Sequence, residues 1–116
     1  MFNYLKLEIF IPESHLTVLQ KALQDVGAGH IGNYDSCLSY SKVTGTWRTL
    51  EGAEPYIGSV GEISREDELK VEVRIESDRL EDTLSAIKKI HPYEEPVIHI
   101  IPLIALEEYR EREKDI

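Results

Sequence analysis

The chain has 116 residues, of which 41% are hydrophobic and 30% are charged, and its formal net charge is −9. This length suits one domain with a modest core. The negative charge has no compensating basic stripe and disfavours nucleic-acid binding, and no apolar run approaches the roughly 18 residues that a membrane span needs. The start of the chain lacks a signal-peptide pattern, and Cys37 is the single cysteine, so a cytoplasmic protein without a disulfide is expected.

The first predicted unit is a strand followed by a helix. Apolar and polar side chains alternate over residues 5–11, which is typical of a half-buried strand. Pro12 suits the first turn of a helix and Ser14 suits its cap, and apolar residues then recur at helical spacing over residues 16–26. Residues 27–29, Gly-Ala-Gly, end this helix, because glycine readily takes the left-handed conformation.

The middle segment, residues 34–63, is rich in Ser, Thr, Tyr and Val and is punctuated by glycines. It predicts a strand over residues 34–48, a loop around 51–58 and a short strand near 59–63. Large side chains of the first of these strands would form an apolar patch on the sheet face that the helices leave uncovered. Monomers seldom leave such patches bare, so the sequence favours a homo-oligomer; the alternative is that a C-terminal helix covers the patch. The patch residues are Tyr34, Leu38, Tyr40, Val43 and Trp47.

A second unit repeats the first. Residues 69–76 alternate as a strand, and residues 80–90 carry an apolar helical face preceded by Asp78 and Glu81 at capping-box spacing. A shift of 64 residues superimposes apolar positions of the two units without a gap, which predicts a duplicated βα pattern. The superimposed pairs are Leu5–Leu69, Leu7–Val71, Ile9–Val73, Ile11–Ile75, Leu16–Leu80, Leu23–Ile87 and Val26–Ile90.

After the second helix, residues 97–101 predict a buried strand and residues 103–113 a helix. The order of elements predicts an α+β fold, a ferredoxin-like split βαβ sandwich with an extra strand or hairpin in the middle and a C-terminal helix. We expect one domain over residues 1–103 and a C-terminal helix or tail over residues 104–116.

Residues 91–96, His-Pro-Tyr-Glu-Glu-Pro, place four ionisable side chains between the second helix and the last strand. Because a residue before proline is pushed out of the helical region, the helix should end at His91. Tyr93 should be partly buried and Glu94 should make a specific hydrogen bond or ion pair, while Glu95 should be more exposed. The segment is either a stiff connector or a site, and in the second case His91 and Glu94 are the candidate metal ligands.

Four motifs of the chain occur together, in this order, in one known family. They are GAGHIGNYD at residues 27–35, GTWR at 45–48, PYIG at 55–58 and HPYE at 91–94. The chain resembles the YqfO-type domain, a PII-like and CutA-like module that is inserted in larger Nif-three-like proteins, and the resemblance covers roughly residues 2–103. It implies a ferredoxin-like subunit that commonly forms a trimer. It does not carry over the dinuclear metal site of full-length Nif-three-like proteins, because that site lies on segments missing here.

Three places in the sequence are candidates for ligand binding. The glycine loop that follows the first helix could direct backbone N–H groups at an anion, or it could simply form a turn. An arginine after Trp47 suits a carboxylate or phosphate ligand, or an ion pair within the protein. The segment over residues 91–96 could bind a divalent metal ion as a cofactor. The candidate ligand-binding residues are Gly29, Gly32, Asn33, Arg48, His91, Tyr93 and Glu94.

The sequence identifies no catalytic residues. Glu94 and Glu95 are adjacent and point apart on an extended backbone, and no Ser or Cys nucleophile comes with a base motif. We therefore expect a small oligomeric binding or regulatory module, a homotrimer that holds a metal ion or a small anion between subunits. The alternatives are a protein-interaction module that docks on a separate core protein and a hydrolase that uses a metal at His91.

Overall fold

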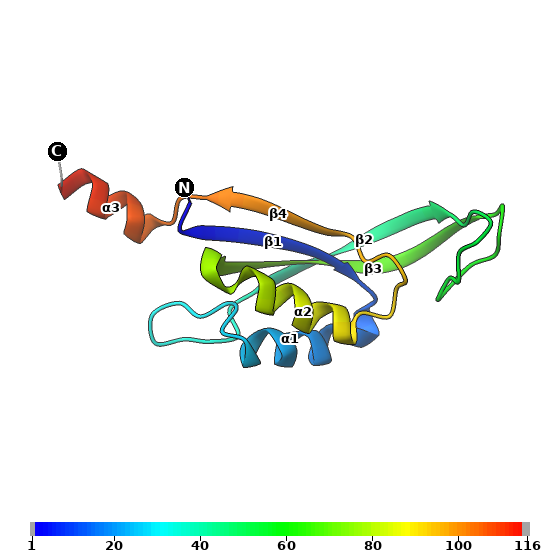
Figure 1. Cartoon of the computed structure of the whole chain (residues 1–116), viewed down its shortest axis with the longest axis horizontal. Helices are drawn as coiled ribbons and strands as arrows, with labels where there is room; N and C mark the ends of the chain where they lie inside the picture. The colour runs from blue at the N-terminus through cyan, green and yellow to red at the C-terminus, as the bar shows by residue number, and fades with distance from the viewer. Residues whose placement is uncertain (1, 115–116) are drawn as a thin grey trace.

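The computed structural model describes residues 2–114 as a two-layer α+β fold, with an antiparallel four-stranded sheet and two helices against one of its faces (Figure 1). The strands are β1 (Tyr4–Ile11), β2 (Ser39–Arg48), β3 (Ile63–Glu76) and β4 (Ile98–Leu103), in the spatial order β2-β3-β1-β4. The helices are α1 (Leu16–Asp25), α2 (Leu80–Ile90) and α3 (Leu106–Lys114). The central strands β1 and β3 each lead into a helix, so the predicted ferredoxin-like split βαβ fold is confirmed. None of the helices within residues 2–114 is long and apolar enough to cross a bilayer.

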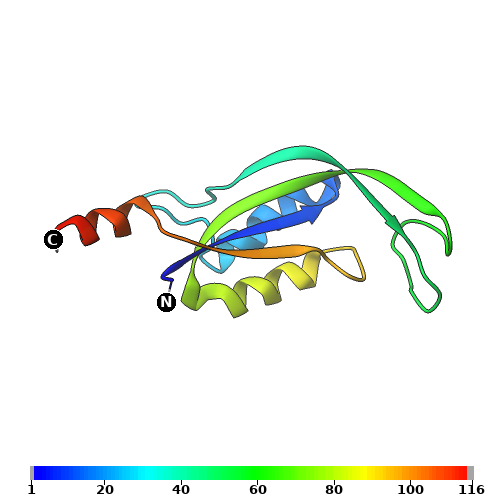
Figure 2. The same cartoon turned by 90° about the horizontal axis from the view of Figure 1, so that it is seen from above.

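The core lies between the sheet and the helices α1 and α2 (Figure 2). Alternate side chains of the two central strands face the helices, because successive residues of a strand point to opposite faces. Leu19, Leu23 and Ile87 pack onto them from the helices. Thr83 is also fully buried, and its hydroxyl donates to the Arg79 carbonyl at 2.6 Å, which offsets the cost of burying a polar group. The strand residues of the core are Leu5, Leu7, Ile9, Ile11, Leu69, Val71, Val73 and Ile75.

The repeat of 64 residues extends to the way in which the helices begin. Short 3-10 turns, Glu13–His15 and Ser77–Arg79, lead into α1 and α2 at equivalent positions. Neither helix has a capping side chain, so the predicted capping roles of Ser14 and Asp78 are wrong. The backbone of each 3-10 turn accepts the first helix N–H instead: the Leu16 N–H donates to the Glu13 carbonyl, and the Leu80 N–H donates to the Ser77 carbonyl.

The strand β2 starts later than the sequence predicts. Residues 34–38 precede the strand, since the chain first closes a tight turn in which Ile31 and Tyr34 exchange backbone hydrogen bonds of 2.8 and 3.0 Å. The ladder with β3 therefore begins only at Ser39, opposite Glu72.

The predicted short strand at residues 59–63 is not a separate element. β3 runs without interruption over 14 residues, and its first part, residues 63–68, pairs only with residues 43–48 of β2. These two half-strands and the loop over residues 49–62 form an arm that extends beyond the end of β1 (Figure 1). We call this unit the arm.

The sheet face away from α1 and α2, the open face, is charged. The carboxylate of Glu8 lies 3.2 Å from His99 Nδ1, 3.3 Å from Lys70 Nζ and 3.5 Å from Lys6 Nζ. Lys6 also lies 2.8 Å from Glu72. The hydrogen bond from His99, followed by the contacts with the two lysines, holds the pKa of Glu8 below its usual range.

The prediction of an apolar patch on one sheet face is therefore wrong. The register of β2 with β3 places Tyr40 on the helix side and Val43 and Trp47 on the open face, while Tyr34 and Leu38 precede the strand. Side chains at even and odd positions of a strand point to opposite faces, so the five residues do not form one surface. The alternative with a covering C-terminal helix is not found either, because α3 lies beyond the end of β4, near the N-terminus (Figure 1).

Candidate ligand-binding site

His91 ties the segment after α2 to the end of β1. The residue is extended, with φ −72° and ψ 128°, while its N–H still bonds the Ile87 carbonyl, so the helix ends there as predicted. Its Nε2 lies 2.7 Å from the Phe10 carbonyl oxygen, and the Tyr93 N–H donates to its Nδ1 at 3.2 Å. Because a carbonyl can only accept, Nε2 carries the proton. Nδ1 accepts a hydrogen bond and therefore carries none, so the ring is neutral.

The surroundings of His91 bear on its predicted role as a metal ligand. Burial lowers its pKa, although the Phe10 carbonyl acts in the opposite direction, and the side chain is only 8% exposed. Both ring nitrogens are engaged, and the Glu94 carboxylate accepts a hydrogen bond from the Glu54 N–H at 2.9 Å, as predicted for Glu94. Among the side chains of residues 2–111, no three His, Cys, Asp or Glu come together as a metal site. A metal at His91 and Glu94 stays a prediction, and it would have to displace one of these bonds.

Tyr93 is the centre of an aromatic cluster. Its ring centroid lies 5.1 Å from that of His91, 5.8 Å from that of Trp47 and 6.0 Å from that of Tyr56, in tilted arrangements. Trp47 comes from the end of β2 and Tyr56 from the loop of the arm. Tilted aromatic pairs at such distances attract one another, so the cluster fastens the arm to the segment after α2.

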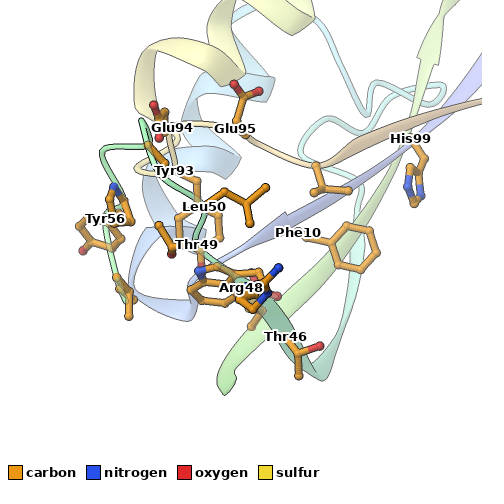
Figure 3. A pocket seen from close by; sticks show the side chains of 16 residues that line it. Phe10, Thr46, Arg48, Thr49, Leu50, Tyr56, Tyr93, Glu94, Glu95 and His99 are labelled. Atoms are coloured by element: carbon orange, nitrogen blue, oxygen red, sulfur yellow. The ribbon is translucent and has the colours of Figure 1, made fainter. Parts of the chain in front are cut away.

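A cavity of about 500 Å³ lies beside this cluster (Figure 3). Its volume falls in the range of pockets that hold small organic molecules, and most of its wall is apolar. In Figure 3, Glu94 and Glu95 lie at one rim, while Phe10 and His99 lie on another side. The lining residues are Phe10, Thr46, Trp47, Arg48, Thr49, Leu50, Ala53, Pro55, Tyr56, Ile57, Glu68, Tyr93, Glu94, Glu95, Val97 and His99.

Two hydroxyl groups in the wall of the cavity are buried without a hydrogen-bond partner, and one carboxylate there has no counter-ion among the side chains of residues 2–111. Glu68 is 7% exposed and forms no ion pair, and the hydroxyls of Thr49 and Tyr93 have no hydrogen-bond partner. Burial raises the pKa of the Tyr93 phenol, and the neighbouring Glu68 carboxylate raises it further, although the two groups do not meet the geometry of a hydrogen bond. Buried polar groups in proteins are normally paired, so this wall has hydrogen-bonding capacity to offer to a ligand.

Gly45 makes room for the Glu68 carboxylate. It lies in β2 opposite Glu66, and a methyl group at this position would collide with the Glu68 side chain. A glycine inside a strand often marks such a close approach. The GTWR motif thus has a physical role, because its glycine admits Glu68 and its tryptophan lines the cavity.

The structure brings some of the predicted ligand residues together. Arg48, Tyr93 and Glu94 all line the cavity, and His91 supports Tyr93 from behind through the bond to its N–H. These residues come from the end of β2 and from the segment after α2, which are far apart in the sequence.

The glycine loop stands apart from them. It is drawn in cyan at the opposite end of the molecule from the arm (Figure 1), so Gly29, Gly32 and Asn33 do not join the cavity. The Gly29 N–H donates to the Arg74 carbonyl at 2.9 Å, and its own carbonyl accepts from the Cys37 N–H at 3.0 Å. These backbone groups therefore close the loop, and an anion there would have to use others.

Four residues that shape the cavity are not among the ligand-binding residues predicted from the sequence: Trp47, Thr49, Tyr56 and Glu68. Trp47 and Tyr56 lie within the motifs at residues 45–48 and 55–58, so the motifs held a signal for them. Glu68 and Thr49 had no such signal. Glu68 is one of several alternating charges in β3, and only the register with β2 places its carboxylate against Gly45.

A model of the family described as CutA1 divalent ion tolerance protein matches residues 53–111, just over half of the chain. The chain belongs to this family. The matched region begins in the loop of the arm and contains β3, α2, the HPYE motif and β4, so it includes much of the cavity wall of this CutA1-family domain.

Relatives of greater length carry a similar sequence. The "GTP cyclohydrolase 1 type 2 homolog" of Halalkalibacterium halodurans is 42% identical over 98 residues, which cover 84% of this chain and 26% of the relative. The protein of the same name from Bacillus subtilis is 36% identical over 98 residues, with the same coverage. The chain thus spans about a quarter of the length of the curated relatives that it matches.

Two solved structures are similar to this chain, one within a longer protein and one of about the same length. A Bacillus cereus protein related to NIF3 has a TM-score of 0.78 at 35% identity, over 90% of this chain and 26% of that one. The divalent ion tolerance protein CutA1 from Ehrlichia chaffeensis has a TM-score of 0.68 at 19% identity, over 99% of this chain and 95% of that one. The predicted resemblance to a CutA-like domain of Nif-three-like proteins is confirmed.

Proposed function

We propose that this domain is a self-associating module that binds a small ligand in the cavity at the base of the arm. The cavity carries the proposal, because it combines aromatic walls with the buried polar groups of Glu68 and Thr49. Burial of a carboxylate without a counter-ion lowers the stability of a fold, so stability alone gives no reason for this arrangement. A ligand that pairs with the carboxylate would offset that cost.

Exposed apolar side chains along β4 support self-association. β4 is an edge strand, and Ile100 and Ile101 on it are exposed, as are Ile104 and Leu106 just beyond it. An open edge with apolar side chains favours pairing with another chain, and β2 offers the other edge of the sheet. A homotrimer is the assembly that we propose, following the family resemblance. Light scattering at micromolar concentration should then give three times the mass of the chain, and a monomer would contradict the proposal.

A metal ion or a small anion between subunits remains the ligand expected from the sequence. For a metal at His91 and Glu94, a neighbouring subunit would have to complete the coordination, since the side chains of residues 2–111 in one chain form no group of three ligands. For an anion, Arg48 is the exposed lining residue that could pair with it.

A second candidate function is docking on a separate core protein. It is favoured by the longer relatives, in which the matched region makes up 26% of the chain. In that role the cavity would receive a side chain of the core protein. Hydrolysis with a metal at His91 has the least support, because both ring nitrogens of His91 form hydrogen bonds within the chain.

Ligand screening would test the proposed binding function. Trp47 is the single tryptophan of the chain and lines the cavity, so its fluorescence reports on this site. The screen should include divalent metal ions, phosphate, nucleotides, carboxylates and amines. A ligand present at 100 times its Kd should stabilise the domain by about 2.7 kcal/mol and should change the Trp47 emission. A stable oligomer that responds to none of these classes would contradict ligand binding and favour the interaction module.

A further inference from the structure

The cavity at the base of the arm contains an acidic group without a counter-ion. Glu68 is only 7% exposed, and no basic side chain of residues 2–111 forms an ion pair with it. Arg48 also lines the cavity, but it is exposed to solvent, and His99 already pairs with Glu8. The uncompensated group in the wall is therefore a carboxylate, and the ligand that it favours carries positive charge.

The walls around this carboxylate suit an organic cation better than a metal ion. The rings of Trp47, Tyr56 and Tyr93 meet beside the cavity, and aromatic faces attract ammonium groups. The hydroxyls of Tyr93 and Thr49 are unpartnered and can accept hydrogen bonds from N–H donors. A metal ion would need several oxygen or nitrogen ligands together, whereas most of this wall is apolar.

Other charged groups nearby point in the same direction. Glu66 lies close enough to Tyr93 to raise the pKa of the phenol, as Glu68 does, and Glu94 and Glu95 lie at the rim of the cavity. The whole chain has a net charge of −9. An anionic ligand would meet this field at every step of its entry, while a cation would be attracted by it.

We propose that the cavity binds a small organic ammonium ion with an apolar body, with the ammonium group beside the Glu68 carboxylate and the aromatic rings of Trp47 and Tyr93. The apolar body lies against the rest of the wall, where Phe10 and Val97 contribute. This inference rests on the proposed binding function and names its ligand class. Gly45 is part of the same site, because the absence of a side chain there lets the Glu68 carboxylate lie against β2.

Three probes of similar size and different charge test this inference. Phenethylammonium, 2-phenylethanol and 3-phenylpropionate are titrated into the full chain, with tetramethylammonium as a second cation, and the Trp47 emission and the heat of binding are measured. The ammonium probes should bind, and phenethylammonium should bind at least about tenfold more tightly than the alcohol, because only a cation forms a charge-assisted contact with the carboxylate.

Two variants locate the effect. Glu68→Gln keeps the shape of the side chain and should weaken phenethylammonium binding by about tenfold or more, with no change for the alcohol. Gly45→Ala should cause a similar loss, since the new methyl group displaces the carboxylate. Glu81→Gln removes the same charge from the exposed start of α2, outside the cavity, and should bind like the original chain.

The outcomes separate this inference from the proposed function. Equal affinity for the ammonium and the alcohol, or unchanged binding by Glu68→Gln, would overturn the inference. If phosphate or a metal ion changes the Trp47 emission and neither ammonium probe does, the inference fails while the binding function stands. If nothing binds and the emission depends only on protein concentration, a neighbouring copy fills the cavity; ligand binding and this inference then both fail, while self-association stands.

Discussion

The two βα units share a core but end their helices in different ways. Residue 27 of the first unit and residue 91 of the second are equivalent under the shift of 64 residues. Gly27 is left-handed, with φ +78°, and its N–H bonds the Gln24 carbonyl at 3.1 Å. His91 is extended, and its side chain bonds to β1 through the Phe10 carbonyl.

This difference explains why the wall of the cavity follows the second helix and not the first. The first end is closed by backbone bonds alone, as in the bond from the Ala28 N–H to the Leu23 carbonyl at 3.0 Å. The second end is held by an imidazole, so the following residues leave the core with large side chains that build a cavity wall. The repeated framework thus has this cavity at only one of its two helix ends, the one at which a histidine and not a glycine ends the helix.

The shared core can be broken at matched positions. Leu23 and Ile87 are equivalent and fully buried against the sheet. Leu23→Ala and Ile87→Ala should each lower the free energy of unfolding by about 2–5 kcal/mol, because each leaves a cavity between a helix and the sheet. Urea unfolding measures both, and the exposed Val18→Ala, expected within about 0.5 kcal/mol of the original chain, is the control. A gap of more than about 2 kcal/mol between the two core variants would show that the units are not equivalent in packing.

A side chain is required at residue 93 and excluded at the equivalent residue 29. Tyr93→Ala should cost about 2–4 kcal/mol through the loss of a large ring from the aromatic cluster. Tyr93→Phe should differ from the original chain by about 0.5 kcal/mol or less, because the deleted hydroxyl has no hydrogen-bond partner. Gly29→Ala should be destabilising by about 1–2 kcal/mol, since its φ is +75° and a methyl group would crowd the Cys37 carbonyl. Thermal or urea unfolding decides, and an unchanged Tyr93→Ala would make the segment a plain linker.

The two helix ends should also differ in their response to pH. Burial lowers the pKa of His91 in the folded state below its ordinary value of 6.5, so the unfolded chain takes up the proton first as the pH falls. The stabilising contribution of neutral His91 is therefore complete above about pH 6.5 and declines below it, by at most about 1.4 kcal/mol per pH unit for one proton. His91→Gln should lose this part of the pH dependence.

The matched control for this experiment is Gly27→Ala at the equivalent residue. Its strain in a left-handed conformation should lower stability by about 1–2 kcal/mol, by the same amount at every pH, because no titrating group changes. Urea unfolding between about pH 7.5 and 5.5 gives both comparisons. If His91→Gln keeps the slope of the original chain, His91 is not the group that titrates.

The sequence predicted the framework because it is encoded locally. Alternation in residues 5–11 and 69–76 and helical spacing after each of them were enough for both units, and the helix end at His91 followed from Pro92. The middle of the chain was harder, since turn residues and strand residues there have similar composition. The separation of Tyr40 from Trp47 depends on register, which composition does not contain.

The site was predicted only in part for a related reason. Tyr93 and Glu94 stand in a rigid segment with an unusual composition, so they were recognisable. Glu68 became part of the cavity through a contact with Gly45 of another strand. Such long-range contacts arise from the fold and leave no pattern in neighbouring residues.

The arm divides the molecule into parts of different local stability. Residues 43–48 and 63–68 pair only with each other, outside the core that α1 and α2 cover, so their amides should exchange with solvent through openings that leave β1 closed. Trp47 and Glu68 belong to the arm, whereas Tyr93 belongs to the segment anchored on β1. A ligand in the cavity would contact both parts, so its binding free energy would include the free energy of keeping the arm closed. Hydrogen exchange along residues 43–48 would measure the free energy of opening the arm directly.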